Sequence, residues 1–184
     1  MPKKDIEGLL ADSFKELALE KPIEKITIRE ITDRAGVIRV TFYNHFQDKY
    51  ELIEWILRKE VMVPVQILWS NQMMDEALTF LFTTILRNKE FYMHVSRLEG
   101  QNSFEDMVRK CFGEAVTQYL KTFARGRQKH PWLTQERAGE FCAMALSYVL
   151  IAWIRSGMHE PPEEMAEIYR FMTTHSMMDL TEEV

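Results

Sequence analysis

The stretch from Ile26 to Val37 limits what this chain can fold into more than any other part of it. Thr27 and Glu30 have the spacing of a capping box, in which the two side chains satisfy free backbone N–H groups at the start of a helix. Gly36 follows, and glycine suits the backbone of a tight turn. The stretch therefore predicts a short helix that ends in a tight turn.

Helical patterns flank this turn on both sides. Apolar residues recur at helical spacing over 5–20, so we expect an amphipathic first helix, which Lys21-Pro22 ends. Beyond the turn, Phe42 and Phe46 lie four residues apart and can anchor a short helix over 38–44 to the core. Residues 5–46 thus hold three short helices, and the last two have the shape of a helix-turn-helix unit.

The rest of the chain is predicted to be helical as well. Asp48 and Glu51 form a second possible capping box, which starts a helix that runs to about Val63, before Pro64. Further helices are expected over 73–87, 89–98, 102–125, 134–158 and 162–178, with breaks at Asn88, Gly100, Gly126 to Pro131 and Pro161-Pro162. Seven glycines and six prolines among 184 residues disfavour a β-rich fold. We expect an all-α fold, with a helix-turn-helix domain over 1–47 and a helical body over 48–184.

The composition is that of a soluble globular protein, with 46% hydrophobic and 28% charged residues. The first five residues, Met-Pro-Lys-Lys-Asp, lack the apolar core of a signal peptide. The most apolar run, from Phe141 to Ile154, is shorter than the ~20 residues that span a bilayer. Cys111 and Cys142 lie far apart and match no metal or redox spacing. We therefore expect a cytoplasmic protein with free thiols and with no metal, cofactor or membrane partner.

Two further classes of function can be weighed from the sequence. The five histidines and two cysteines lack metal-ligand spacing, and there is no P-loop, dinucleotide-binding glycine motif or Gly-x-Ser-x-Gly elbow, so we do not expect an enzyme. The net charge of −5 is unusual for a nucleic-acid-binding protein. Physiological salt screens charges beyond roughly 8 Å, however, so distant acidic residues hardly weaken a local basic contact.

The region of the tight turn carries a more specific pattern. Ile26 to Ile31 is followed by Ala35-Gly36-Val37, by Thr41-Phe42-Tyr43-Asn44-His45-Phe46 and by Lys49. This pattern closely resembles the signature of the TetR family of transcriptional regulators, which spans the turn, the recognition helix and the start of the fourth helix. The resemblance implies a DNA-binding helix-turn-helix domain and a helical body that binds small effectors and forms a homodimer.

The side chains around the expected recognition helix suit two kinds of DNA contact. Such a helix puts several side chains into a major groove about 12 Å wide while its other face joins the core. For base edges we predict Arg39 and Thr41, with Ile38 and Val40 against thymine methyl groups. For phosphates, which fix register without reading sequence, we predict Tyr43, His45, Lys49 and Thr27. Lys49 also lies near a helix N-terminus, whose free N–H groups favour an anion.

Two residues depart from the family pattern. The position of Ile38 usually holds a small hydroxyl residue that can cap the recognition helix, which isoleucine cannot do. The position of Val40 is usually small. These departures and the acidic net charge support an alternative interpretation, a protein-interaction module whose helix-turn-helix no longer binds DNA.

The expected body is rich in methionine and aromatic residues. Methionine adapts its shape and suits a pocket for irregular apolar ligands, although the same residues can simply fill a core. As a candidate effector pocket we predict Trp69, Phe80, Phe91, His94, Arg97, Met107, Phe112 and Met144. A largely apolar effector would then bind between the helices of residues 62–153.

The run from Phe141 to Ile154 contains one non-apolar residue, Ser147. A helix that is apolar all round has to be buried on more than one side, and a second copy of the chain is the simplest cover for the outer side. The family resemblance implies that this helix and the last one form a four-helix dimer interface. A homodimer would bind a near-palindromic stretch of double-stranded DNA, the operator.

A few short stretches resemble a narrower subgroup of the family, the regulators of dihydroxyacetone kinase operons. They are Glu54-Trp55-Ile56, Trp153-Ile154-Arg155-Ser156-Gly157-Met158 and Pro161-Pro162-Glu163-Glu164. In that subgroup the implied role is activation, with a kinase-like partner protein carrying the ligand. Whether the chain represses or activates transcription, and whether an effector binds the chain or a partner, stays open at this point.

Overall fold

The computed structural model describes residues 5–124, 130–175 and 179, and all regular elements within these ranges are helices. The expected all-α fold is therefore confirmed. The elements are α1 (Ile6–Glu20), the 3₁₀ turn η1 (Ile23–Lys25), α2 (Ile28–Ala35), α3 (Arg39–Tyr43), α4 (Lys49–Ile56), the π-helical segment η2 (Leu57–Met62), α5 (Val63–Ser70), α6 (Met74–Arg87), α7 (Lys89–Val95), the 3₁₀ turn η3 (Gly100–Asn102), α8 (Phe104–Phe123), α9 (Gln135–Ser156) and α10 (Pro162–Thr174).

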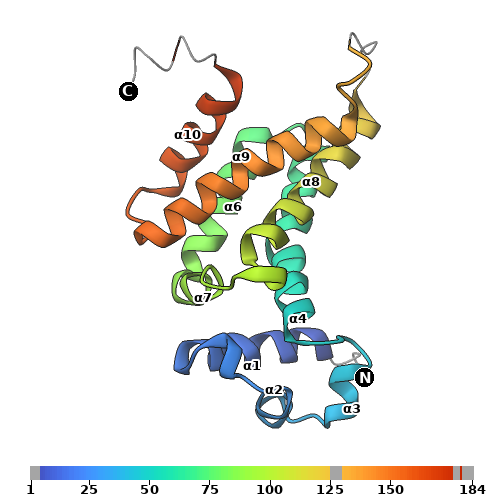
Figure 1. Ribbon diagram of the computed structural model, residues 1–184, viewed down its shortest axis with the longest axis vertical. Coiled ribbons are helices and arrows are strands. Elements are labelled where there is room, and N and C mark those ends of the chain that lie inside the picture. The colour runs from blue at the N-terminus through green and yellow to red at the C-terminus, as the bar shows by residue number, and fades with distance from the viewer. Residues whose placement is uncertain (1–4, 125–129, 176–178, 180–184) are drawn as a thin grey trace.

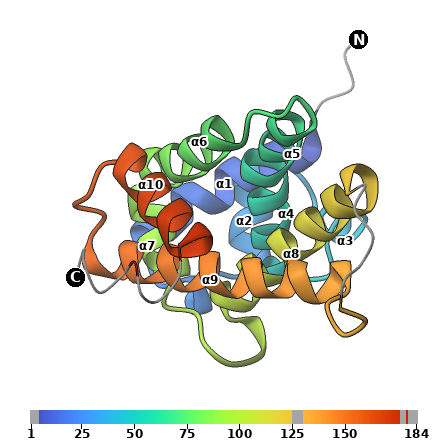
Figure 2. The same ribbon diagram turned by 90° about the horizontal axis from the view of Figure 1, so that it is seen from above.

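The helices form two tiers (Figure 1). The first three helices lie together at one end of the molecule, and α4 leads from them into a larger body formed by α5 to α10. Seen from above, α8 and α9 run beside each other along one side of the body, and α10 lies between α9 and α6 (Figure 2). The three-helix tier is thus attached to the body through α4 and through contacts between α1 and α7.

The predicted capping box and glycine turn are present at the two ends of α2. The Thr27 hydroxyl accepts a hydrogen bond from the Glu30 amide, and the Glu30 carboxylate accepts one from the Thr27 amide, which completes the capping box. At the other end of α2, Gly36 has a φ of +67°, in the left-handed region that glycine adopts without steric cost. These three residues fix both ends of α2, so its bounds follow from the sequence.

The expected end of the fourth helix before Pro64 is wrong. The helical path continues through Pro64, because α4 passes into the π-helical segment η2 and then into α5. The Val63 amide bonds the carbonyl of Arg58, five residues back, and Pro64 lies in the first turn of α5. Proline has no N–H to donate, so the helical path lacks one hydrogen bond at Pro64 but does not end there.

The later helices lie within a few residues of their expected bounds, with the largest shift at the end of α7. Part of the expected break from Gly126 to Pro131 and the expected last residues of the final helix, 176–178, lie outside the described residues. α8 and α9 cross closely at Gly139, where an added Cβ would lie 2.3 Å from the Thr117 hydroxyl oxygen and 2.9 Å from the Gly113 carbonyl oxygen. Glycine is required there because the two backbones approach each other.

The helix that carries the apolar run is longer than the run itself. By length and composition alone, α9 could cross a membrane, but half of its most apolar window is buried inside the protein. Core helices of soluble proteins share this property. The packing of α9 against α8 and α10 is that of a core helix.

Candidate DNA interface

The short helix α3 has one anchored side and one open side. Phe42 is fully buried and packs against Phe46, with ring centroids 5.7 Å apart. Ile38 and Val40 are 70% and 63% exposed, although both are large and apolar. Arg39 is exposed as well, and Thr41 is half-buried. Three of the four predicted base-contact residues are thus open to solvent at the start of α3.

Arg39 and Tyr43 contact each other on this open side. The Nη2 atom of Arg39 donates a hydrogen bond of 3.0 Å to the Tyr43 hydroxyl, and the guanidinium carbon lies 5.3 Å from the centre of the tyrosine ring. The tyrosine ring packs edge-on against Phe42, with centroids 5.6 Å apart. Tyr43 is 47% exposed, so its hydroxyl remains open to a further partner.

Two other predicted phosphate contacts lie on the same tier. Thr27 is exposed at the N-terminus of α2, where its side chain closes the capping box. His45 follows α3, and its Nδ1 atom lies 3.4 Å from a carboxylate oxygen of Glu7 on α1. Both side chains are at the surface, and each contacts another residue of the same chain, Glu30 for Thr27 and Glu7 for His45.

Lys49 is placed differently from the other predicted phosphate contacts. Its ammonium donates hydrogen bonds of 2.8, 2.8 and 2.9 Å to the carbonyls of Ile23, Glu24 and Ile26. An ammonium has three N–H donors, so the segment between α1 and α2 uses all of them. Burial lowers the pKa of Lys49, against the opposing effect of nearby carboxylates such as Glu24.

A charged network that the sequence did not suggest ties α4 and η2 to α8. Glu54 of α4 accepts hydrogen bonds from Lys110 and Arg58, and Arg58 also bonds Glu114 of α8. Burial raises the pKa of the Glu54 carboxyl, but the hydrogen bonds from Lys110 and Arg58 outweigh it and the net shift is downward. Lys110 and Glu114 lie 56 residues from their partners Glu54 and Arg58, so no local spacing could reveal these two contacts, whereas Glu54 and Arg58 are themselves only four residues apart.

A second connection joins α1 to the body. Phe14 and Phe91 meet edge-to-face with centroids 6.1 Å apart, and Lys15 bonds Glu60 of η2 at 2.6 Å. Phe91, predicted as an effector contact, therefore packs against α1 of the three-helix tier.

The other predicted effector residues do not gather around one cavity. Trp69 and Phe112 are buried and meet edge-to-face, with centroids 5.3 Å apart. Four of the predicted residues line four separate grooves. Phe80 lines a groove of about 460 Å³ on α6, and Phe91 lines a groove of about 570 Å³ against α1. Met107 lines a groove of about 320 Å³ beside α4, and Met144 lines a groove of about 960 Å³ between α8 and α9. His94 is half-buried and Arg97 is exposed.

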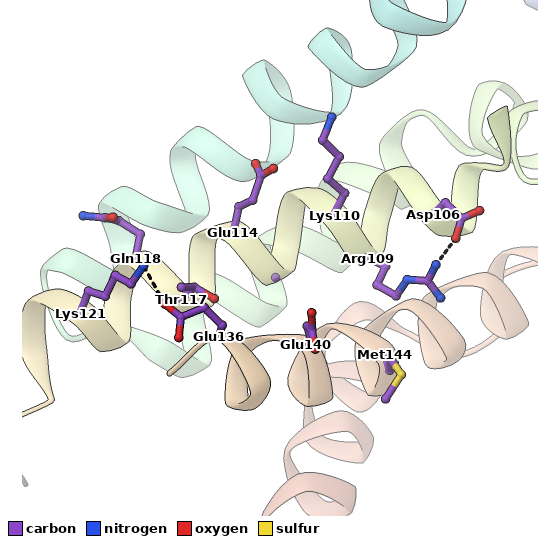
Figure 3. A pocket seen from close by; sticks show the side chains of 11 residues that line it. Asp106, Arg109, Lys110, Glu114, Thr117, Gln118, Lys121, Glu136, Glu140 and Met144 are labelled. Carbon is purple, nitrogen blue, oxygen red and sulfur yellow. Dashed lines mark hydrogen bonds and ion pairs between the residues drawn. The ribbon is translucent and has the colours of Figure 1, made fainter. Parts of the chain in front are cut away.

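The largest of these grooves is lined mainly by charged side chains, and its cations are paired (Figure 3). Lys121 bonds Glu136 at 2.8 Å across the groove, and Arg109 bonds Asp106 on α8. Because these cations already face carboxylates, the groove offers little free positive charge to an anionic ligand.

The outer side of α9 is apolar and open. Phe141, Met144 and Tyr148 are 62%, 52% and 68% exposed and follow one another at helical spacing. On α10, Ile168 and Met172 are also exposed. The chain itself thus buries one side of the apolar run, and the other side is exposed to solvent in the single chain.

Comparison with known proteins adds independent information. The family described as "Bacterial regulatory proteins, tetR family" matches residues 12–56, and the family described as "Transcriptional regulator C-terminal region" matches residues 72–175. A curated relative, the HTH-type dhaKLM operon transcriptional activator DhaS of Lactococcus lactis subsp. lactis strain IL1403, is 35% identical over 60 residues, which are 32% of each chain. The chain thus spans about a third of the length of this curated relative.

Solved structures resemble the chain over nearly its whole length. The dihydroxyacetone kinase operon activator DhaS covers 92% of this chain and 94% of its own, with a TM-score of 0.64 and 19% identity. The TetR-family repressor FadR of Thermus thermophilus, solved in complex with lauroyl-CoA, covers 91% and 93%, with a TM-score of 0.62 and 17% identity. At these identities the likeness concerns the fold.

Proposed function

The chain belongs to the TetR family of transcriptional regulators, which are DNA-binding proteins rather than enzymes, and we propose that it is a cytoplasmic homodimer that binds a near-palindromic operator. In this proposal α3 of each copy enters the major groove of one half-site. The expected helix-turn-helix regulator and its non-enzymatic nature follow from family membership. The dimer, the operator contacts and the effector are the parts that we propose.

The observation that carries the DNA contacts is the open start of α3. Ile38, Arg39 and Val40 face solvent there although two of them are large and apolar. Exposed apolar side chains of this size are expected where a partner surface covers them, and thymine methyl groups in a major groove are such a surface. Arg39 supplies donors for guanine O6 and N7 at the same place.

The outer side of α9 supports the homodimer. Phe141, Met144 and Tyr148 form an apolar stripe on a helix whose other side is in the core. Two copies that pack these stripes against each other would remove the stripes from water and place two α3 helices on one duplex. The two half-sites are then separated by about one turn of DNA or more.

For the effector we propose a small apolar ligand that enters beside α5 and α8 and relieves repression. The support is an aromatic row in which Trp69 contacts Phe112 and Tyr119, and Tyr119 contacts Phe123, with centroids 4.9 to 5.9 Å apart. This row runs from buried Phe112 to exposed Phe123. The lauroyl-CoA complex of a structural relative is consistent with an apolar ligand in this kind of body.

A second candidate is an activator that a partner protein controls. The observation in its favour is that the predicted effector residues line separate grooves in this chain. The likeness to the operon activator DhaS points the same way. In this case no small ligand binds the chain on its own, and the aromatic row serves only as core.

Selection of bound sites from random double-stranded DNA, followed by titration over a range of salt concentrations, tests the proposed function. We expect a near-palindromic consensus and an affinity that falls steeply with salt. Absence of binding even at low salt would instead support the protein-interaction module. For the effector, thermal unfolding with a panel of medium-chain fatty acyl compounds should raise the Tm, and a Trp69→Ala variant should lose that shift.

A further inference from the structure

Arg39, in the five-residue helix α3, differs from two other arginines of the three-helix tier in the kind of side chain that it contacts. Arg29 pairs with Asp33, and Arg34 pairs with Glu20, so both of these arginines have carboxylate partners. Within the described part of the chain, Arg39 forms no ion pair, and its side-chain partner is the Tyr43 hydroxyl. The residue best suited to read a base is therefore held by a neutral group.

A neutral partner suits a side chain that has to bind DNA. A carboxylate would cancel the charge of the guanidinium and would compete with the guanine acceptors. The tyrosine hydroxyl takes one of the five N–H donors and leaves four, including the pair needed for bidentate contact with O6 and N7. It also reduces the number of arginine rotamers, so less side-chain entropy is lost on binding.

The tyrosine is itself held in place. Its ring packs edge-on against Phe42, which is fully buried and contacts Phe46. The path from core to base reader thus runs from Phe42 through Tyr43 to Arg39, within one turn of helix. This support matters because Ile38 gives α3 no side-chain cap, so the helix alone is a weak platform.

We propose that Tyr43 is a positioning residue for DNA sequence recognition, which acts by orienting Arg39 toward one base pair in each half-site. This inference rests on the proposed reading of DNA by α3. It differs from the phosphate contact that the sequence predicts for Tyr43, because a phosphate contact strengthens binding to all sequences alike.

The test compares base preferences rather than affinity alone. Sites are selected from random DNA with the full-length wild type and with Arg39→Ala, Tyr43→Phe and Tyr50→Phe variants. Tyr43→Phe keeps the ring that contacts Phe42 and removes only the hydroxyl, so the fold is expected to persist, and circular dichroism checks this. Tyr50→Phe removes a tyrosine hydroxyl from the neighbouring helix α4 and serves as the matched control.

We expect Arg39→Ala to abolish the preference at one position per half-site. Tyr43→Phe should weaken the preference at that same position by about three- to tenfold, as for the loss of one hydrogen bond, and leave the other positions unchanged. In the Arg39→Ala background the further change Tyr43→Phe should have no effect on preference, because the residue it orients is gone. Tyr50→Phe should select the wild-type sites.

Two results would overturn the inference. Tyr43→Phe could weaken operator and random DNA by the same factor, with effects that add to those of Arg39→Ala, which is the behaviour of an independent phosphate contact. It could also leave every base preference intact. If the wild type itself selects no sequence, the proposed function fails first, and this outcome is distinguishable from the other two.

Discussion

Lys49 shows how the position of a residue in the sequence can suggest one role and its contacts in the fold another. Its place at the start of a helix suits a phosphate contact, but the ammonium is surrounded by three carbonyls from the segment between α1 and α2. Those carbonyls lie 23 to 26 residues away in the chain, so no local pattern indicates them. The side chain fastens α4 to the beginning of the helix-turn-helix unit.

Replacing Lys49 with methionine should therefore lower the free energy of unfolding. The variant keeps the apolar stem but leaves three carbonyls without their donor, and we expect a loss of about 1–3 kcal/mol. Urea unfolding of the wild type and the variant measures this difference, with Lys25→Ala as a control for removing an exposed lysine nearby. Unchanged stability, together with a salt dependence of DNA binding that falls by about one unit per site, would show that Lys49 contacts phosphate instead.

Glu30 makes stability depend on acid pH. Hydrogen bonds from Lys21 and from Thr27 lower the pKa of its carboxyl to about 2 from an ordinary value of 4.5. Because the folded-state pKa is the lower one, this stabilisation is present above about pH 4.5 and is lost as the pH falls toward about 2. Glu30→Gln should thus lower the Tm at pH 6, and the gap to the wild type should narrow steadily from pH 4.5 to pH 2. A gap that stays constant over this range would contradict the assignment.

At the scale of single elements, α3 is the weakest part of the helix-turn-helix unit. It has five residues, and its N-cap residue, Ile38, makes no side-chain hydrogen bond. α2, by contrast, has a complete capping box and a glycine end. The recognition helix is therefore held by Phe42 and Phe46 in the core more than by its own backbone.

Ile38→Ser should strengthen α3 locally. A serine hydroxyl at the N-cap can accept a hydrogen bond from the Val40 or Thr41 amide, which stabilises a helix by about 0.5–2 kcal/mol. Hydrogen exchange of the amides of α3 should slow by a corresponding factor in this variant. Ile38→Ala removes the same apolar side chain without adding a cap, and it should not slow exchange. Equal exchange in the serine and alanine variants would show that the N-cap does not limit α3.

How far the sequence predicts an element depends on whether its cause is local. The bounds of α2 follow from Thr27, Glu30 and Gly36, because caps and turns act over a few residues. The path through Pro64 does not follow, since proline can end a helix or begin a new stretch, and tertiary packing decides between them. The positions of Trp69, Phe91 and Met144 depend on long-range packing as well. A prediction of one shared pocket from composition alone therefore could not show that these residues lie in different parts of the body.

At the scale of the whole molecule, the two tiers present different exposed surfaces. The first tier presents Ile38, Arg39 and Val40, and the body presents the apolar stripe of Phe141, Met144 and Tyr148. The network around Glu54 and Arg58 lies between them and couples the position of α4 to that of α8. A homodimer through the stripe would set the distance between two copies of α3, which is what a palindromic operator requires.

Tyr148→Glu should convert the dimer into a monomer. A carboxylate in the apolar stripe would be buried without a partner in the dimer, which disfavours association strongly. Light scattering at micromolar concentration should give twice 21.8 kDa for the wild type and 21.8 kDa for the variant. Ile67→Glu is the matched control, because Ile67 is 58% exposed on α5, outside the stripe, and it should remain dimeric. A monomeric wild type would remove the basis for a palindromic operator.

The most direct test of the account is the affinity of the wild type and Arg39→Ala for the selected operator and for a shuffled duplex, measured by fluorescence anisotropy. We propose that Arg39 contacts a base, so its loss should weaken operator binding by about 1–3 kcal/mol and hardly change binding to the shuffled duplex. The preference for the operator then falls by the same amount. If Arg39→Ala weakens both duplexes equally, or if the wild type binds both alike, α3 does not read DNA sequence through Arg39, and the account is contradicted.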